Sequence, residues 1–247
     1  MVKKAQVTIF TIIAILIVAV AFGYVLLQGD IKPVVTPDIK PVYSYVGNCI
    51  DKTANDAVYY IGQTGGYFIV PEKSLDIHMA YYYDQGKNYT PSKKRIENEL
   101  ALYFDTMLFF CTKNFIDYPD FEIEQGEPLT RVEIEPGKVI FDVDYPIVIS
   151  KNNRNHYYKR FHTEVPVRLY GIHEVAENIT KLQMKAPYIC VSCLHEIASD
   201  NKLFIKMYDY TQEDLIFEII DNQTRINGED FRFYFANKYE IGEWIIE

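Results

Sequence analysis

An uninterrupted apolar segment near the start of the chain constrains the fold more than any other feature of the sequence. No charged residue occurs between Gln6 and Gln28, and 21 mostly apolar positions run from Val7 to Leu27. As a helix, this segment would be about 32 Å long, against a hydrocarbon core of roughly 30 Å in a bilayer. A buried core helix would need a polar stripe, which the segment lacks. The segment therefore predicts a transmembrane helix over residues 7–28.

The residues on either side of this segment predict its orientation. Lys3 and Lys4 precede it, whereas the charges that follow it, one aspartate and one lysine, cancel. Because positive residues concentrate on the cytoplasmic side, we expect a cytoplasmic tip at residues 1–6, membrane lipid around residues 7–28 and an extracytoplasmic remainder, as in a single-pass protein of the cell membrane. The bulky residues after the segment offer no A-x-A-like cleavage site, so a removed signal peptide is not expected.

The junction ahead of the apolar segment carries a family resemblance. The motif Lys3-Lys4-Ala5-Gln6, a basic pair, a small residue and a glutamine, resembles the class III signal sequence of archaeal type IV pilins and archaellins. The prepilin peptidase of that family cuts on the cytoplasmic side, which implies cleavage between Ala5 and Gln6 and an apolar helix that stays on the mature protein. Many members carry a glutamate at the fifth mature position, where this chain has Phe10, and the resemblance ends near residue 28. An ordinary signal anchor with a chance Ala-Gln pair is the alternative.

A proline-rich segment follows the apolar one. The motif Asp-Ile-Lys-Pro-Val occurs at residues 30–34 and again at residues 38–42. Proline removes an amide donor and disfavours helix at the preceding residue, so we expect an extended stalk over residues 29–43. Its repeated part would reach about 40 Å. Such a break argues against the continuous helical rod of a filament subunit and favours a single head on a stalk.

The remaining residues, 44–247, are enough for one domain, and their patterns predict a single α+β head built on an antiparallel β-sheet. Period-two alternation between residues 120 and 170 predicts a meander of antiparallel strands. Helical spacing predicts two to four helices, segregated from the strands along the chain. In residues 44–64 this spacing predicts one apolar face, made of Val46, Ile50, Ala54, Ala57, Val58 and Ile61. The expected helices cover residues 44–64, 90–115 with Thr90 as N-cap, 171–186 and 193–200, and further short strands are expected at 67–70, 77–83, 202–210, 214–220 and 231–239, with a hairpin loop at 221–230.

The four cysteines predict two disulfides. Cys49, Cys111, Cys190 and Cys193 form an even set in a head placed outside the membrane, and three pairings are possible. Cys49 and Cys111 fall on the first two predicted helices of the head, so we expect them to pair and Cys190 to pair with Cys193. The alternative for Cys111 is a buried, unpaired thiol.

Candidate chemistry concentrates in the segment Cys-Val-Ser-Cys-Leu-His-Glu at residues 190–196. A zinc site needs four ligands, of which two cysteines and His195 would supply three, and a thioredoxin-type motif needs a βαβ context that the pattern does not predict. The segments beginning at His173 and His195 start like a zinc-peptidase motif but lack its second histidine. The sequence has no P-loop and no nucleophile-elbow motif. We therefore assign no catalytic, cofactor-binding or metal-ligating residue.

Charge excludes one class of partner. The net charge of −9 argues against nucleic-acid binding, because phosphate neutralisation needs a basic face. Acidic residues spread over several predicted strands should form a solvated face rather than a calcium site, and three asparagines are predicted glycosylation sites. The acidic residues are Glu122, Glu124, Glu133, Glu135, Asp142 and Asp144, and the asparagines are Asn88, Asn178 and Asn222.

These patterns together predict a membrane-anchored cell-surface protein with a structural or binding role. Its partners would be surface proteins or other copies of itself, without a cofactor. The alternative is an extracytoplasmic enzyme, a hydrolase or a thiol-disulfide protein, that uses Cys190, Cys193 and His195. A concave pocket that gathers His195, a cysteine and carboxylates would favour the enzyme.

Overall fold

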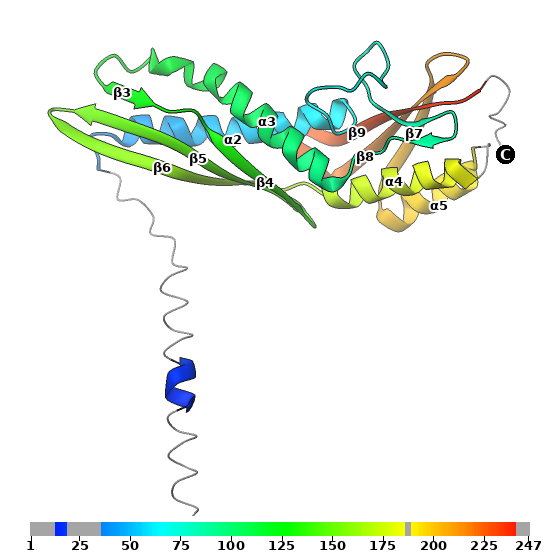
Figure 1. Ribbon diagram of the computed structural model, residues 1–247, viewed down its shortest axis with the longest axis horizontal. Helices are drawn as coiled ribbons and strands as arrows, with labels where there is room; N and C mark the ends of the chain where they lie inside the picture. Colours follow the sequence, from blue (N-terminus) through cyan, green and yellow to red (C-terminus); the bar gives the residue numbers. More distant parts are fainter. Residues whose placement is uncertain (1–12, 19–35, 186–188, 241–247) are drawn as a thin grey trace, which may run out of the picture. The chain divides into compact units, whose positions relative to one another are not determined.

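The computed structural model describes residues 13–18, 36–185 and 189–240. The chain divides into two compact units, Met1–Thr36 and Pro37–Glu247. In the first unit, residues 13–18 form a short helix whose side chains are exposed. The second unit holds all the other described helices and strands (Figure 1).

The predicted transmembrane helix is the main correction. Within the described residues, no helix is both long enough and apolar enough to cross a membrane. The helix over residues 13–18 covers only part of the predicted span, and the rest of residues 7–28 lies outside the described residues, as do Ala5 and Gln6. On this finding, the predicted fold class is wrong in its membrane helix, and the predicted single-pass localisation with an extracytoplasmic head is wrong as well.

The second unit is α+β and contains two sheets rather than one. Figure 1 shows them at opposite ends of the unit. The first sheet has five strands in the order β2-β1-β9-β8-β7, and β1 runs parallel to β9, which departs from the purely antiparallel prediction. We call it the five-stranded sheet. Its strands are β1 (Tyr81–Asp84), β2 (Lys87–Asn88), β7 (Phe204–Asp209), β8 (Asp214–Ile226) and β9 (Glu229–Lys238).

The second sheet is the predicted antiparallel meander, built around one long strand, β5. Strand β6 pairs along one edge of β5, while β4 and then β3 pair along the other edge. Apolar side chains of β5 alternate with more exposed ones, so one face of the meander is buried. The strands are β3 (Glu122–Gln125), β4 (Leu129–Glu135), β5 (Lys138–Lys151) and β6 (Arg154–Val165).

Helix α2 joins the two sheets, because it packs on β6 of the meander and on β9 of the five-stranded sheet. Helix α3 packs on α2 and β4, α4 on β1, β2 and β4, and α5 on β7. The helices are α2 (Lys40–Gln63), α3 (Lys93–Thr112), η1 (Lys113–Phe115), α4 (Leu169–Lys185) and α5 (Val191–Asn201).

The buried face of α2 is the predicted one, but the helix begins earlier. All its predicted core residues are buried, and Cys49 on this face is bonded to Cys111 of α3 with a Cα–Cα distance of 5.5 Å. Pro41 lies in the first turn, where an amide has no helical partner, so it is tolerated there. Residues 37–43 are therefore turn and helix rather than the predicted extended stalk, and residues 29–35 lie outside the described part.

Three local predictions fail for identifiable reasons. Residues 67–70 are a loop, because the backbone amides of Phe68 and Ile69 donate to the carboxylate of Glu99, both at 2.9 Å, instead of to a strand. Helix α3 is capped by Ser92 rather than Thr90, since the Ser92 hydroxyl accepts from the Arg95 amide at 3.2 Å. Strand β8 continues through most of the predicted loop at 221–230.

Candidate functional site

The segment predicted to carry chemistry lies on the surface at the start of α5. Cys190 and Cys193 form a disulfide, as predicted, with a Cα–Cα distance of 5.2 Å. Cys190 is the N-cap residue, and its Sγ accepts from the Cys193 amide at 3.2 Å. His195 is exposed on the same helix. The cavities of about 280 Å³ and 510 Å³ in the second unit are lined by none of these three residues.

The structure also places the other candidates from the sequence, which are His173 and the three predicted glycosylation sites. His173 is buried, and its Nε2 lies 2.7 Å from the backbone oxygen of Pro91, which ties α4 to the segment before α3. Its role is therefore a contact between elements. The three asparagines of the predicted glycosylation sites, Asn88, Asn178 and Asn222, are exposed on β2, α4 and β8. Their modification stays a prediction.

Two carboxylates on the acidic face of the meander have cross-strand partners. Asp142 accepts a hydrogen bond from the imidazole Nδ1 of His162 at 2.8 Å, and Asp144 forms an ion pair with Lys159 at 3.1 Å. The hydrogen bond to Asp142 raises the pKa of His162. Within the described residues, no group of three or more histidine, cysteine or acidic side chains is placed to hold a metal ion.

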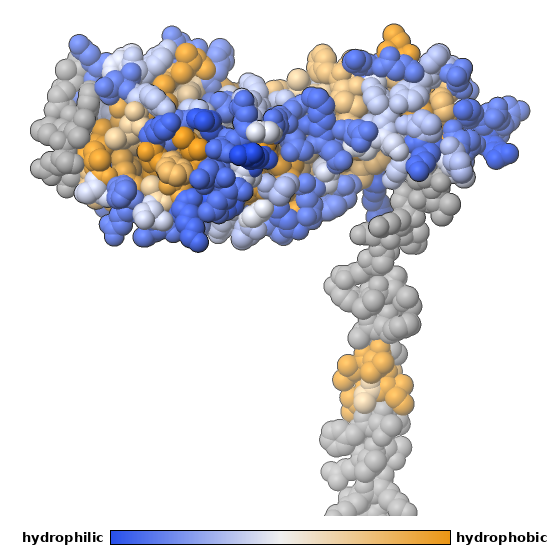
Figure 2. All heavy atoms as spheres, turned by 180° about the vertical axis from the view of Figure 1, so that it is seen from behind, coloured by the Kyte–Doolittle hydropathy of each residue, from blue (hydrophilic) through white to orange (hydrophobic). Residues whose placement is uncertain are grey.

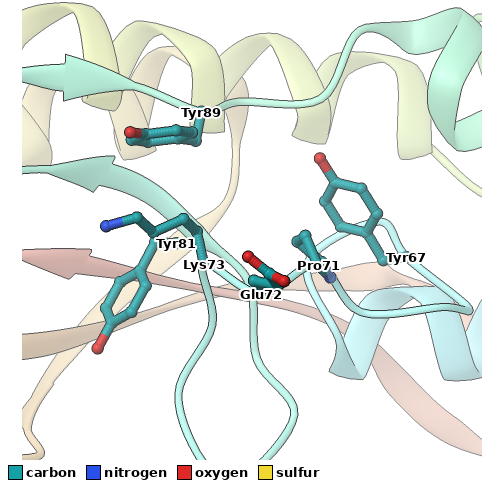
Figure 3. A pocket seen from close by; sticks show the side chains of 6 residues that line it. All are labelled: Tyr67, Pro71, Glu72, Lys73, Tyr81 and Tyr89. Atoms are coloured by element: carbon teal, nitrogen blue, oxygen red, sulfur yellow. The ribbon is translucent and has the colours of Figure 1, made fainter.

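A cavity of about 280 Å³ beside β1, the tyrosine pocket, combines aromatic rings with charges of both signs. In Figure 3 the rings of Tyr67 and Tyr89 lie on two sides of the space, with the carboxylate of Glu72 between them. Lys73 extends on the Tyr89 side, with its Nζ 5.9 Å from the centroid of that ring. The residues lining the tyrosine pocket are Tyr67, Pro71, Glu72, Lys73, Tyr81 and Tyr89.

The loop that carries the pocket is fixed by α3. Gly66 has a φ of +90°, and a Cβ there would come within 3.0 Å of Ile96, so the turn after α2 requires glycine. Glu99, which is buried, accepts the two loop amides described above and also pairs with Arg95 at 2.6 Å. The guanidinium of Arg95 in turn lies 5.6 Å from the centroid of the Tyr67 ring. Tyr67 is thereby held in place from the helix.

Backbone hydrogen bonds fix the opposite side of the pocket. The amide of Tyr81 donates to the Lys73 oxygen at 3.0 Å, and the amide of Tyr89 donates to the Tyr82 oxygen at 2.8 Å. The Tyr81 hydroxyl donates to Asp214 at 2.7 Å, and Figure 3 shows it pointing away from Tyr89. Tyr81 therefore forms part of the wall, while Tyr67 and Tyr89 offer ring faces and hydroxyls to the cavity.

The two charged side chains of the tyrosine pocket, Lys73 and Glu72, differ in whether they form an ion pair. The Lys73 ammonium pairs with the buried carboxylate of Asp84 at 2.5 Å, and this hydrogen bond raises the pKa of Lys73, which keeps it protonated. Glu72 is exposed and forms no salt bridge within the part of the chain that the structure describes. Its two oxygens are available as acceptors, and Lys73 retains further N–H donors. The arrangement can bind a ligand that both donates and accepts hydrogen bonds.

No local motif in the sequence pointed to this pocket. Its residues come from a loop, from β1 and from the residue after β2, and none has a spacing associated with a known chemistry. The only signal was the high tyrosine content, 21 residues in 247. Comparison with known proteins adds no family: no family model, no curated protein and no solved structure matches this chain.

Proposed function

We propose that the second unit is a binding module and that the tyrosine pocket holds a neutral, polyhydroxylated ring such as a sugar residue. The single observation that carries this proposal is the pairing of two tyrosine rings with one carboxylate and one ammonium around the same small cavity. Ligand pockets commonly combine aromatic walls with a few polar groups that fix orientation.

The charges of the pocket favour a neutral ligand. An anion placed between the rings would meet the carboxylate of Glu72, and a cation would meet the ammonium of Lys73. Both contacts between like charges are unfavourable at close range. A hydroxyl group can donate to Glu72 and accept from Lys73, so several hydroxyls on one ring use both groups.

The rings of Tyr67 and Tyr89 supply the apolar surface on which a sugar ring can pack. Tyr67 and Tyr89 each present a large flat apolar surface with a polar hydroxyl at its tip. The apolar C–H face of a sugar ring can pack on such a surface while its hydroxyls reach the polar groups around it. Because Arg95 contacts the ring of Tyr67 and Lys73 contacts the ring of Tyr89 before a ligand arrives, little side-chain ordering opposes binding.

Saturation-transfer-difference NMR on the full chain tests this proposal. The probes are the methyl glycosides of glucose, galactose and mannose and free N-acetylglucosamine, with tetramethylammonium and inorganic phosphate as charged probes. We expect at least one sugar to bind with a Kd on the order of millimolar, as suits a small open site. Binding of a charged probe without any sugar would contradict the proposal.

Matched variants locate the binding. Tyr89→Ala and Glu72→Gln should each weaken sugar binding by about fivefold or more. The controls are Tyr157→Ala, an exposed tyrosine of β6, and Glu122→Gln, an exposed glutamate of β3, which should leave the Kd unchanged. Equal loss in both sets, or none in either, would show that the sugar does not bind in the tyrosine pocket.

A second candidate function is thiol-disulfide exchange at Cys190 and Cys193. It is favoured by their position at the N-terminus of α5, where the helix dipole stabilises a thiolate. A substrate thiolate would attack one Sγ and form a mixed disulfide, and a second substrate thiolate would then release two reduced cysteines and an oxidised substrate. Incubation with a reduced dithiol peptide, followed by thiol counting, tests it. No gain of protein thiols over a Cys190→Ser, Cys193→Ser variant would exclude it.

A further inference from the structure

A groove beside helix α3, in the other half of the unit, has a different character from the tyrosine pocket. Its volume is about 510 Å³. We call it the α3 groove. Its walls include Asp105 and Phe109 of α3, Gln125 at the end of β3, residues 126–128 between β3 and β4, and Tyr145 of β5.

The loop wall of the α3 groove is held in place without a ligand. The amide of Gly126 donates to the Pro146 oxygen at 2.8 Å, and a Cβ on Gly126 would come within 2.8 Å of the proline ring. Only glycine permits this close approach between the loop and β5. The hydroxyl of Tyr145 donates to the side-chain oxygen of Gln125. The groove is therefore preformed on a rigid sheet.

Large apolar side chains in and beside the groove are unusually exposed. Phe109 in the groove wall is 57% exposed, its neighbour Phe110 is 64% exposed, and Leu129, which follows the lining residue Pro128, is 72% exposed. The rings of Phe109 and Phe110 pack edge to face, with centroids 6.0 Å apart. Isolated exposed apolar residues are common, but a cluster around a cavity is typical of interaction sites.

The two carboxyl side chains in the groove wall have no basic side chain among the other lining residues. They are Asp105 and Glu127, and no lysine, arginine or histidine is among the lining residues. One oxygen of Asp105 accepts from the Thr130 amide at 3.3 Å, whereas the other is buried and has no hydrogen-bond partner within the described residues. Burial raises the pKa of Asp105, and hydrogen bonds from Thr130 oppose this only in part. Asp105 therefore contributes a partly buried carboxylate to the groove wall.

We propose that the α3 groove docks a segment of another protein in which a lysine or arginine is flanked by aromatic or aliphatic side chains. The cation would meet the carboxylates of Glu127 and Asp105 in the groove wall, and the apolar side chains would cover Phe109 and Phe110. Another copy of this chain is disfavoured, because two molecules with a net charge of −9 repel each other. This proposal is independent of the tyrosine pocket, which uses other residues.

Selection from a phage-displayed library of random dodecamer peptides on the full chain tests the proposal. We expect the enriched peptides to carry a basic residue close to aromatic or aliphatic residues. A synthetic peptide of the enriched sequence should bind Asp105→Asn and Phe110→Ser at least about tenfold more weakly than the unmodified chain. Its Kd for the control variants Asp209→Asn and Phe204→Ser, exposed residues of β7, should be unchanged.

Three outcomes would overturn the proposal. The first is enrichment without a basic residue, or equal binding to the groove and control variants. The second is reversible self-association of the unmodified chain in sedimentation that Phe110→Ser abolishes, which would make a second copy the occupant. The third is binding of the unmodified chain, but not of Phe110→Ser, to phosphatidylcholine vesicles without peptide enrichment, which would make a lipid surface the occupant. Circular dichroism of each variant separates loss of binding from loss of folding.

Discussion

The five-stranded sheet and the meander bury different kinds of groups. Strand β8 of the five-stranded sheet carries three buried carboxylates, Asp214, Glu218 and Asp221, of which the last two are 1% and 0% exposed. The buried residues of β5 in the meander are apolar or tyrosine, and the charges of that sheet lie on its outer face. Figure 2 shows apolar and charged side chains unevenly distributed over one face of the unit, with a large apolar area on the half of the five-stranded sheet.

The two halves are accordingly stabilised in different ways. Glu218 accepts hydrogen bonds from Tyr208, Tyr234 and Arg232, and Asp221 from Arg168, Thr224 and the Gln223 amide, so both carboxylates are satisfied inside the sheet. The meander is held by apolar packing under α2 and α3, which a disulfide joins. Acid should therefore act first on the five-stranded sheet, and reduction should act first on the meander.

The largest expected effect is on the disulfide between α2 and α3. Replacing Cys49 and Cys111 by serine opens a loop of 62 residues, which should lower the free energy of unfolding by about 4 kcal/mol on the chain-entropy estimate. Urea denaturation of the double variant measures this loss. A loss below about 1 kcal/mol would show that α2 and α3 hold the meander without the covalent tie.

The next largest effect is expected at Asp221, a buried carboxylate of β8. Burial raises the pKa of Asp221, but the hydrogen bonds from Arg168, Thr224 and the Gln223 amide outweigh it and hold the pKa below its ordinary value. Asp221→Asn should lower the free energy of unfolding at neutral pH by about 3 kcal/mol, because it leaves buried donors unmatched. The control Asp209→Asn, on the exposed face of β7, should change it by less than about 0.5 kcal/mol.

The carboxylate of Asp221 also determines the direction in which the free energy of unfolding changes with pH. A lowered pKa in the folded state means that the stabilisation is present above the unfolded pKa, near 4, and is lost as the pH falls through the folded value. Unfolding measured between neutral pH and pH of about 2 should therefore show a loss of stability in the unmodified chain that is smaller in Asp221→Asn. Parallel curves for the two chains would contradict this assignment.

A smaller effect is expected at the second disulfide. Cys190 and Cys193 are three residues apart, so their bond removes little freedom from the unfolded chain. Replacing both by serine should cost about 1–2 kcal/mol, in contrast to the pair that joins α2 and α3. Thermal unfolding of the two double variants side by side measures the difference, and equal losses would contradict it.

The smallest effect on the free energy of unfolding is expected for the exposed pair of His162 and Asp142 in the meander. The hydrogen bond to Asp142 raises the pKa of His162, so its stabilisation is present below the unfolded pKa of about 6.5 and is lost as the pH rises through the folded value. Because the pair is exposed, His162→Gln should change the free energy of unfolding by less than about 1 kcal/mol at pH about 6, and less at pH about 9. A larger change would mean that the meander also depends on charge.

Much of the fold could be predicted because it depends on local periodicity. The buried face of α2, the antiparallel meander and both disulfide pairings follow from spacing along the chain. The errors arise where a distant residue decides the local structure. The segment at 67–70 reads as a strand, but its amides are taken by Glu99 of α3, and β1 pairs in parallel with a strand more than 140 residues away.

The candidate sites could not be predicted from the sequence for the same reason, because distant residues form them. The tyrosine pocket is assembled from three short segments, and its charge balance depends on the contact of Lys73 with Asp84. The α3 groove depends on a loop that closes against Pro146. The one local feature that did suggest chemistry, the pair of cysteines before His195, lies on the surface outside both cavities.

A titration of the isotope-labelled full chain with the strongest-binding methyl glycoside, followed by NMR of the backbone amides, tests most directly whether the tyrosine pocket binds a sugar ring. We expect the largest shifts at the amides of Tyr67, Lys73 and Tyr89, which lie in the walls of the pocket, and none at Gly126 of the α3 groove. Shifts confined to the groove or to α5, or no saturable shift anywhere, would contradict the proposed function.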